Sequence, residues 1–141
     1  MQPAAPISPF AGAYAPSSAE FDAIARRALQ RLPADFRRQC DGLVIQIHEF
    51  ADDETLDEMG IDSPFDLFGL FKGQGLAQRP AMPGTGAEPN LVLLYRRPLL
   101  DLWCEGEETL EAIIEHVLVH EIGHHFGLSD EDIERIEAGA G

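Results

Sequence analysis

Residues 120–130 read HEIGHHFGLSD, from His120 to Asp130, and they contain the pattern H-E-x-x-H. The pattern lies at the end of the most apolar predicted helix, over residues 107–126. Residues four apart are neighbours on a helix surface, so His120 and His124 project from one side, one turn apart. Two imidazoles placed in this way can each give a nitrogen to one Zn²⁺ at about 2.0–2.1 Å. The sequence therefore predicts a metal site at the end of this helix.

The residues around these histidines suit a site that performs chemistry. Glu121 adjoins the first predicted ligand, where its carboxylate can take a proton from a metal-bound water. Gly127 suits the left-handed conformation that ends a helix, after which the chain can fold back and bring Asp130 to the metal as a third ligand. Three protein ligands leave a fourth position for water, as in catalytic zinc sites. We therefore predict a zinc-dependent hydrolase, more narrowly a small metallopeptidase.

Each of these assignments has an alternative. Two ordinary buried histidines, bonded to backbone or carboxylate groups, would account for His120 and His124 without a metal. Asp130 also suits the first turn of a following helix, where the helix dipole favours an acid. We favour the metal because the pattern lies on a strongly predicted helix with glycine and aspartate at suitable offsets. Three neighbouring carboxylates compete with Asp130 as the third ligand: Glu131, Asp132 and Glu134.

Other polar residues are predicted to have supporting or structural roles. His116 lies one turn before His120, and we expect it to meet a carboxylate or solvent rather than the ion. We expect His125, which points away from the two predicted ligands, to be a surface or packing residue. The sequence leaves several candidates open as stabilisers of a developing oxyanion: His48, Tyr95, Arg96 and Arg97.

Composition narrows the class of protein. The chain has 141 residues, 45% of them hydrophobic, which predicts one soluble globular domain. Its 10 Lys+Arg against 25 Asp+Glu give a net charge of −15, which argues against nucleic acid or an anionic membrane as the main partner. We expect a peptide or unfolded protein substrate instead, and the sequence leaves the oligomeric state open. Cys40 and Cys104 are widely separated, and we expect two reduced core thiols.

The beginning of the chain lacks the features of a secretory signal. The first 25 residues contain no Lys or Arg, and no long apolar run follows Met1. No apolar stretch approaches the roughly 20 residues that span a bilayer. We therefore expect a cytoplasmic protein. Residues 1–16, rich in proline and alanine, are predicted to form a flexible tail, and residues 17–141 a single domain.

Local patterns predict the remaining elements. Ser17 and Glu20 fit a capping box that opens an amphipathic helix ending at Pro33. Residues 34–41 are expected to be a connector, and the acidic stretch that begins at Asp52 a solvated surface. Further elements are assigned by range: strands over 43–50 and 91–95, with the second bounded by Arg96, Arg97 and Pro98; a short helix or turn from Ser63 to Phe71; a long loop over 73–90; and a last helix over 130–138.

From His120 to Asp130 the chain resembles the zincin superfamily, and it looks most like the small bacterial zincin-like metallopeptidases with H-E-x-x-H-x-x-G-x-x-D. A weaker likeness in residues 67–73 and 91–100, with matching helix and strand order, extends the resemblance to about residues 18–137. The resemblance implies an α+β fold of the minimal zincin-like kind, with a small mixed β-sheet packed on helices and the metal motif on the core helix.

The same resemblance implies roles for individual residues. His120, His124 and Asp130 would hold Zn²⁺, and Glu121 would be the catalytic base. An extended peptide would pair with the edge strand of the sheet above the metal. One alternative is a non-catalytic metal- or peptide-binding module that retains a zincin-type site. Another is a structural zinc or metal-free interaction domain, in which a fourth protein ligand would replace the water.

Overall fold

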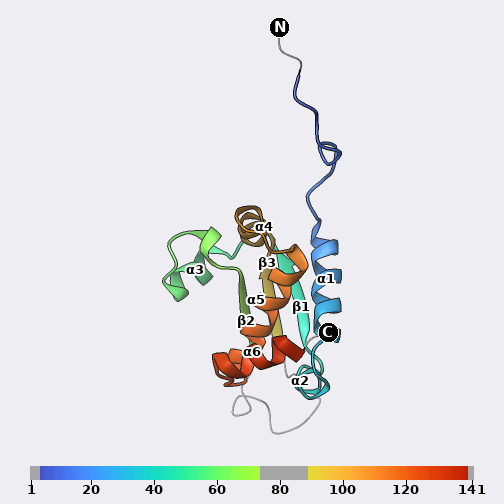
Figure 1. Ribbon diagram of the computed structural model, residues 1–141. Helices are drawn as coiled ribbons and strands as arrows, with labels where there is room; N and C mark the ends of the chain where they lie inside the picture. Colours follow the sequence, from blue (N-terminus) through green and yellow to red (C-terminus); the bar gives the residue numbers. More distant parts are fainter. Residues whose placement is uncertain (1–3, 74–88, 140–141) are drawn as a thin grey trace.

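The computed structural model describes residues 4–73 and 89–139 (Figure 1). These residues form six α-helices, one short 3-10 helix and three β-strands. The helices are α1 (Ser18–Gln30), α2 (Ala34–Gln39), α3 (Asp53–Met59), η1 (Pro64–Asp66, the 3-10 helix), α4 (Arg96–Glu105), α5 (Leu110–His125) and α6 (Asp130–Gly139). The strands are β1 (Val44–His48), β2 (Gly69–Lys72) and β3 (Leu91–Tyr95).

The three strands form one mixed sheet in the order β1-β3-β2. The outer strand β1 runs parallel to β3, whereas β2 runs antiparallel to it, with Gly69 opposite Leu94. Successive side chains of a strand point to opposite faces. In β3, Val92 and Leu94 enter the main core, while Leu93 and Tyr95 enter a smaller cluster on the other face. The central strand is therefore buried on both faces, and β2 lies at one edge of the described sheet.

The helix α5 is the centre of the main core. It contacts β2 and β3, and α1 lies against both α5 and β1 (Figure 1). Ile114, Leu118 and Ile122 have no exposed surface. Burying one such side chain contributes roughly 1.5–3 kcal/mol relative to leaving it exposed. The α+β fold class predicted from the resemblance is thereby confirmed, with the predicted metal motif on the core helix.

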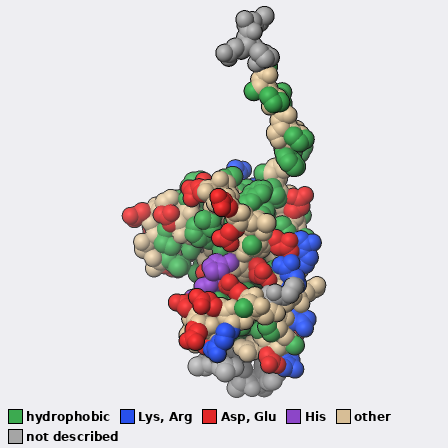
Figure 2. Space-filling view, in the orientation of Figure 1, with side chains coloured by type: hydrophobic (Ala, Val, Ile, Leu, Met, Phe, Trp, Pro, Cys, Tyr) green, Lys and Arg blue, Asp and Glu red, His purple; other side chains and the backbone are tan. Residues whose placement is uncertain are grey.

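One side of α5 remains open to solvent. Eight residues of α5 are buried, but the side that carries three histidines is not. The side chains of His116, His120 and His124 are 56%, 27% and 54% exposed. These residues lie four apart and therefore follow one face of the helix. Figure 2 shows histidine side chains at the surface, bordered by acidic ones, on the face where α5 and α6 meet.

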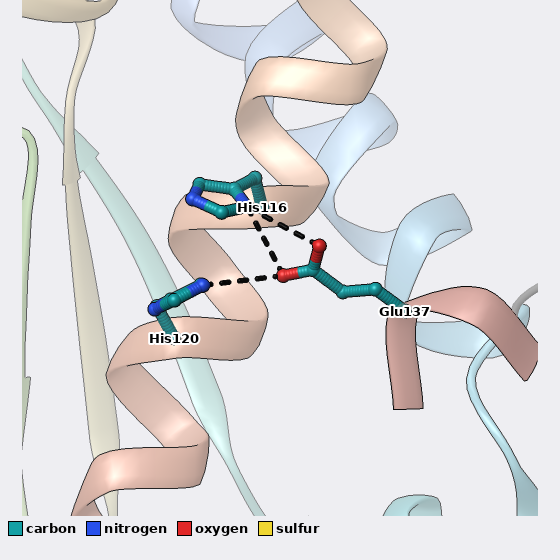
Figure 3. A group of neighbouring side chains, drawn as sticks. All are labelled: His116, His120 and Glu137. Carbon is teal, nitrogen blue, oxygen red and sulfur yellow. Dashed lines mark hydrogen bonds and ion pairs between the residues drawn. The ribbon is translucent and has the colours of Figure 1, made fainter. Parts of the chain in front are cut away.

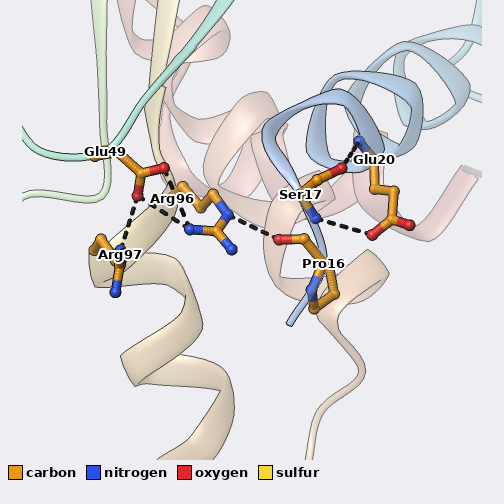
Figure 4. A network of polar contacts seen from close by, with 6 residues as sticks. All are labelled: Pro16, Ser17, Glu20, Glu49, Arg96 and Arg97. Carbon is orange, nitrogen blue, oxygen red and sulfur yellow. Dashed lines mark hydrogen bonds and ion pairs between the residues drawn. The ribbon is translucent and has the colours of Figure 1, made fainter. Parts of the chain in front are cut away.

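The N-terminus of α1 has the predicted cap. The Ser17 hydroxyl accepts a hydrogen bond from the Glu20 backbone N–H at 3.2 Å, and the Glu20 carboxylate accepts one from the Ser17 N–H at 2.9 Å. The Arg96 guanidinium donates to the Pro16 carbonyl at 2.8 Å and pairs with Glu49 (Figure 4). These contacts fix the start of α1 against the start of α4.

Several predicted element assignments are corrected by the structure. The expected connector at 34–41 contains α2, and the acidic stretch after residue 51 is the helix α3. Asp52 caps α3 by accepting a hydrogen bond from the Thr55 N–H at 2.8 Å, and Gly60 ends it with φ 67°. A capped helix satisfies its first amide groups, and its charged side chains can still face solvent. The acidic composition of α3 is therefore the same as that of a solvated loop.

Corrections also apply around the sheet. The short helix or turn expected after Ser63 is only η1, and β2 follows it. The first strand is shorter than the range 43–50, and α4 begins at Arg96, among the residues that were expected to bound the second strand. Cys104 is exposed rather than in the core, although Cys40 is buried and both thiols are free. Most of the predicted loop at 73–90 lies outside the described residues. In the parts of the chain that are described, no helix has the length and apolar character to cross a membrane.

Candidate metal centre

The turn between α5 and α6 brings the end of the motif back toward its beginning. Gly127, with φ 77°, occupies the left-handed region, and its N–H donates to the His124 carbonyl at 3.0 Å. The Leu128 N–H donates to the Gly123 carbonyl at 2.9 Å. This pair of bonds is a Schellman motif, which satisfies carbonyls at a helix C-terminus and reverses the chain. The predicted role of Gly127 in ending the helix agrees with this geometry.

Close packing of α6 on α5 then sets the position of Asp130. A Cβ atom added to Gly123 would lie 2.8 Å from Ile133 Cγ1, so only glycine permits this approach of the two helices. Ser129 caps α6, because its hydroxyl accepts a hydrogen bond from the Asp132 N–H at 3.1 Å. Asp130 is therefore placed at the first turn of a short, capped helix that is held against α5.

His120, His124 and Asp130 lie together at this corner. One ligand atom from each lies within 4.8 Å of the others, and His124 Nε2 lies 3.4 Å from Asp130 Oδ1. A tetrahedral zinc with ligands at about 2.0–2.1 Å keeps neighbouring donor atoms roughly 3.3–3.4 Å apart. Two imidazoles and a carboxylate are also a donor set that zinc accepts. The residues present therefore fit a zinc ion, and their assignment as ligands stays a prediction.

The competing carboxylates are placed less favourably. The Asp132 carboxylate accepts a hydrogen bond from the Ser129 backbone N–H at 3.3 Å and pairs with Arg135. A hydrogen bond with the Ser129 side chain, together with the bond from the Ser129 backbone N–H and the pairing with Arg135, lowers the pKa of Asp132. Neither Asp132 nor its neighbours Glu131 and Glu134 joins the two histidines in a group of candidate ligands within the described residues. Asp130 is the predicted third ligand that the fold brings to them.

Glu121 lies beneath the edge strand β2. A Cβ atom on Gly69 would lie 2.9 Å from Val117 Cγ1 and 3.4 Å from Glu121 Cγ, so the absence of a side chain at Gly69 lets β2 pack closely on α5 beside the glutamate. Burial raises the pKa of the Glu121 carboxyl, while His124 and the Phe71 backbone amide act in the opposite direction. A carboxyl group with a raised pKa beside a candidate metal site is suited to accept and return a proton.

His120 is biased toward its neutral form. Burial lowers the pKa of His120, and repulsion from His116 and His124 adds to this effect, against the attraction of Glu137 and Asp130. A histidine must be neutral to give a lone pair to a metal. The electrostatics around His120 therefore favour the form that can bind a metal.

The edge strand β2 presents backbone groups next to Glu121. The Tyr95 N–H donates to the Phe68 carbonyl at 3.0 Å, and β2 continues antiparallel to β3. Residues of an antiparallel strand alternate between bonding their partner strand and facing away from it. Gly69 and Phe71 are thus the residues of β2 whose N–H and C=O groups point away from β3.

Glu137 lies at the site but was not singled out from the sequence. Its Oε1 atom lies 3.1 Å from His116 Nδ1 and 3.4 Å from His120 Nε2 (Figure 3). The expectation that His116 meets a carboxylate is confirmed by this contact. Glu137 follows Asp130 by seven residues, two helical turns along the same side of α6. That spacing is the signal in the sequence that would have suggested it.

The remaining candidate residues are engaged elsewhere. His125 stacks on Phe71 with ring centroids 3.9 Å apart, which confirms the packing role expected for it. His48 contacts the Gln46 side chain at 2.9 Å. Arg96 and Arg97 both pair with Glu49. Among the residues left open as oxyanion stabilisers, these three are held by other side chains.

Comparison with known protein families gives a match over most of the chain. Residues 40–140 match the profile of a family described as zincin-like metallopeptidase. The matched range includes the sheet, α5 and α6, and begins after α1. No curated protein is significantly similar to the chain.

Proposed function

The chain belongs to the zincin-like metallopeptidase family, and we propose that it is a zinc-dependent peptidase with Glu121 as its general base. The observation that carries the proposal is the grouping of His120, His124 and Asp130, whose candidate ligand atoms lie within 4.8 Å of one another. Glu121 precedes His124 on the same helix and is partly buried beneath β2. The α5–α6 corner thus combines a candidate metal site with a candidate proton acceptor.

The chemistry divides between the ion and the protein. When bound, zinc lowers the pKa of a coordinated water toward about 7 and polarises the peptide carbonyl. The Glu121 carboxylate accepts the proton that the attacking water loses. It then gives that proton to the amine that leaves. Its partly buried position keeps the pKa of this carboxyl above the usual range, which makes the carboxylate a stronger base for the proton that the water loses.

The proposed substrate is a peptide or unfolded protein segment in an extended conformation. Such a segment can add to a sheet edge through backbone hydrogen bonds. Gly69 and Phe71 of β2 point their backbone groups away from β3 and lie next to Glu121. A peptide paired with Gly69 and with the Phe71 carbonyl would run past the Glu121 carboxylate, on which the Phe71 N–H acts.

The test replaces Glu121 by Gln, which keeps the size of the side chain and removes its basicity. We expect Glu121→Gln to retain one equivalent of zinc and to lose hydrolysis of a peptide library by roughly 100-fold or more. Metal content and peptide cleavage are measured on the same preparations. The exposed Glu107, just before α5, gives the matched control Glu107→Gln, which should cleave as the wild type does.

Two results would redirect the proposal. Equal cleavage by wild type and Glu121→Gln would contradict the role of Glu121 as base. Zinc binding without cleavage of any library peptide by the wild type would favour the alternative, a metal- or peptide-binding module that does not turn over.

A further inference from the structure

We propose that His116, His120 and Glu137 form a second position for a divalent metal ion. This position lies about one helical turn along α5 from the first. It shares His120 with the first set, and the two positions are filled one at a time. The inference concerns metal binding and does not depend on peptidase activity.

The distances within this second set match those of metal ligands. One ligand atom from each of the three residues lies within 4.8 Å of the others. Glu137 Oε1 lies 3.1 Å from His116 Nδ1 and 3.4 Å from His120 Nε2. These separations agree with the roughly 3.3–3.4 Å between neighbouring ligands of a tetrahedral zinc. Figure 3 shows the carboxylate of α6 directed at both rings of α5.

An unsatisfied oxygen points to the same conclusion. Within the described residues, Glu137 Oε1 is buried and makes no hydrogen bond, although two imidazole nitrogens lie within 3.4 Å. The other oxygen of Glu137, Oε2, contacts His116 Nδ1 at 3.3 Å. A buried carboxylate oxygen that lacks a hydrogen bond is costly. A cation between the carboxylate and the two rings would satisfy it.

Sharing of His120 limits occupancy to one ion. A neutral imidazole has one nitrogen that carries a proton and one with a free lone pair, so it ligates one metal at a time. The two sets differ in the remaining ligands: His116 and Glu137 in one, and His124 and Asp130 in the other. An ion in the second position is therefore held without His124 and Asp130.

The experiment isolates the second position by disabling the first. Asp130→Asn removes the carboxylate that only the first set contains. Zn²⁺ is titrated into the full chain by calorimetry, with circular dichroism to verify folding. We expect the wild type and Asp130→Asn each to bind one equivalent. Adding His116→Ala or Glu137→Gln to Asp130→Asn should weaken binding by about 10-fold or more.

The matched control adds His48→Ala to Asp130→Asn. His48 lies on β1 and belongs to neither set, so this variant loses one imidazole without loss of a proposed ligand. Equal zinc affinity in the His48 and His116 double variants would overturn the proposal. Two equivalents bound to the wild type would overturn the sharing of His120.

A single variant separates this inference from the proposed function. His116→Ala alone leaves the first set intact and should still bind one equivalent. Complete loss of zinc in that variant would show that the first set does not hold the ion, which would refute the proposed peptidase site. Zinc would then bind at the second position alone.

Discussion

Cys40 is the residue whose ionisation the fold opposes most clearly. Its side chain is buried at the end of α2, and burial raises the pKa of the thiol from 9.0 to about 11. Below pH 9 the thiol is protonated in both folded and unfolded chains. Between pH 9 and 11 the unfolded chain loses this proton and the folded one keeps it, so the free energy of unfolding falls. At pH 10 the loss should be roughly 1 kcal/mol.

Denaturant unfolding at pH 8 and pH 10, with a reductant present, measures this effect. Cys40→Ala should show a smaller decrease between the two pH values than the wild type. Cys104 is exposed, so Cys104→Ala is the control and should behave as the wild type does. If Cys40→Ala and the wild type lost equal stability, the thiol would not be the group responsible.

Single residues of the site differ in how far the sequence predicts them. The proximity of His120 and His124 follows from helix periodicity, which is a local property. Glu137 belongs to another helix, and its approach to His120 depends on how α6 packs. That packing is set by the contact between Gly123 and Ile133, which no pattern within either helix reveals.

At the scale of the element, the α5–α6 pair depends on Gly123. In Gly123→Ala the new methyl group would lie 2.8 Å from Ile133 Cγ1, so α6 must move away from α5. Overpacking of this kind costs about 1–3 kcal/mol, and the higher helix propensity of alanine returns up to about 1 kcal/mol. We expect lower stability and also weaker zinc binding, because Asp130 moves with α6.

Denaturant unfolding and zinc titration of Gly123→Ala test both effects. Gly106→Ala is the control, since its Cβ would meet the Leu102 carbonyl at an ordinary 3.7 Å. Loss of stability with unchanged zinc affinity would show that the position of α6 does not determine metal binding.

The elements themselves were predictable where their patterns were long or capped. The apolar pattern of α5 and the capping box of α1 are local signals, and both helices were predicted. The strand β2 was missed because Gly69–Lys72 is only 4 residues long and its partner β3 is distant in the sequence. The helix α3 was missed although Asp52 and Gly60 supply both of its ends, because its acidic residues outweighed them.

At the scale of the whole molecule, the division into a tail and a domain stays a prediction. The side chains of Ile7, Phe10 and Tyr14 are 82%, 78% and 97% exposed. Contacts with the domain begin at the Pro16 carbonyl, which accepts a hydrogen bond from Arg96. Removing residues 1–15 should therefore change the free energy of unfolding by no more than about 0.5 kcal/mol.

A longer deletion gives the comparison. Removing residues 1–17 also removes the Pro16 carbonyl and the Ser17 cap of α1. The loss of such a cap costs about 0.5–2 kcal/mol. Thermal unfolding of the two shortened chains should separate them, with the longer deletion less stable. Equal stability would place the start of the domain after residue 17.

The Schellman turn at Gly127 has a consequence for how the protein would respond to metal supply. It places His120 and Asp130 together. Only nine residues lie between them, so an ion that binds both closes a very short loop. Closing a loop this small removes little freedom from an unfolded chain. The core around α5 and the sheet is built without these side chains. An ion bound there could thus exchange while the fold stays intact, and the availability of the metal would control the proposed peptidase activity without any refolding.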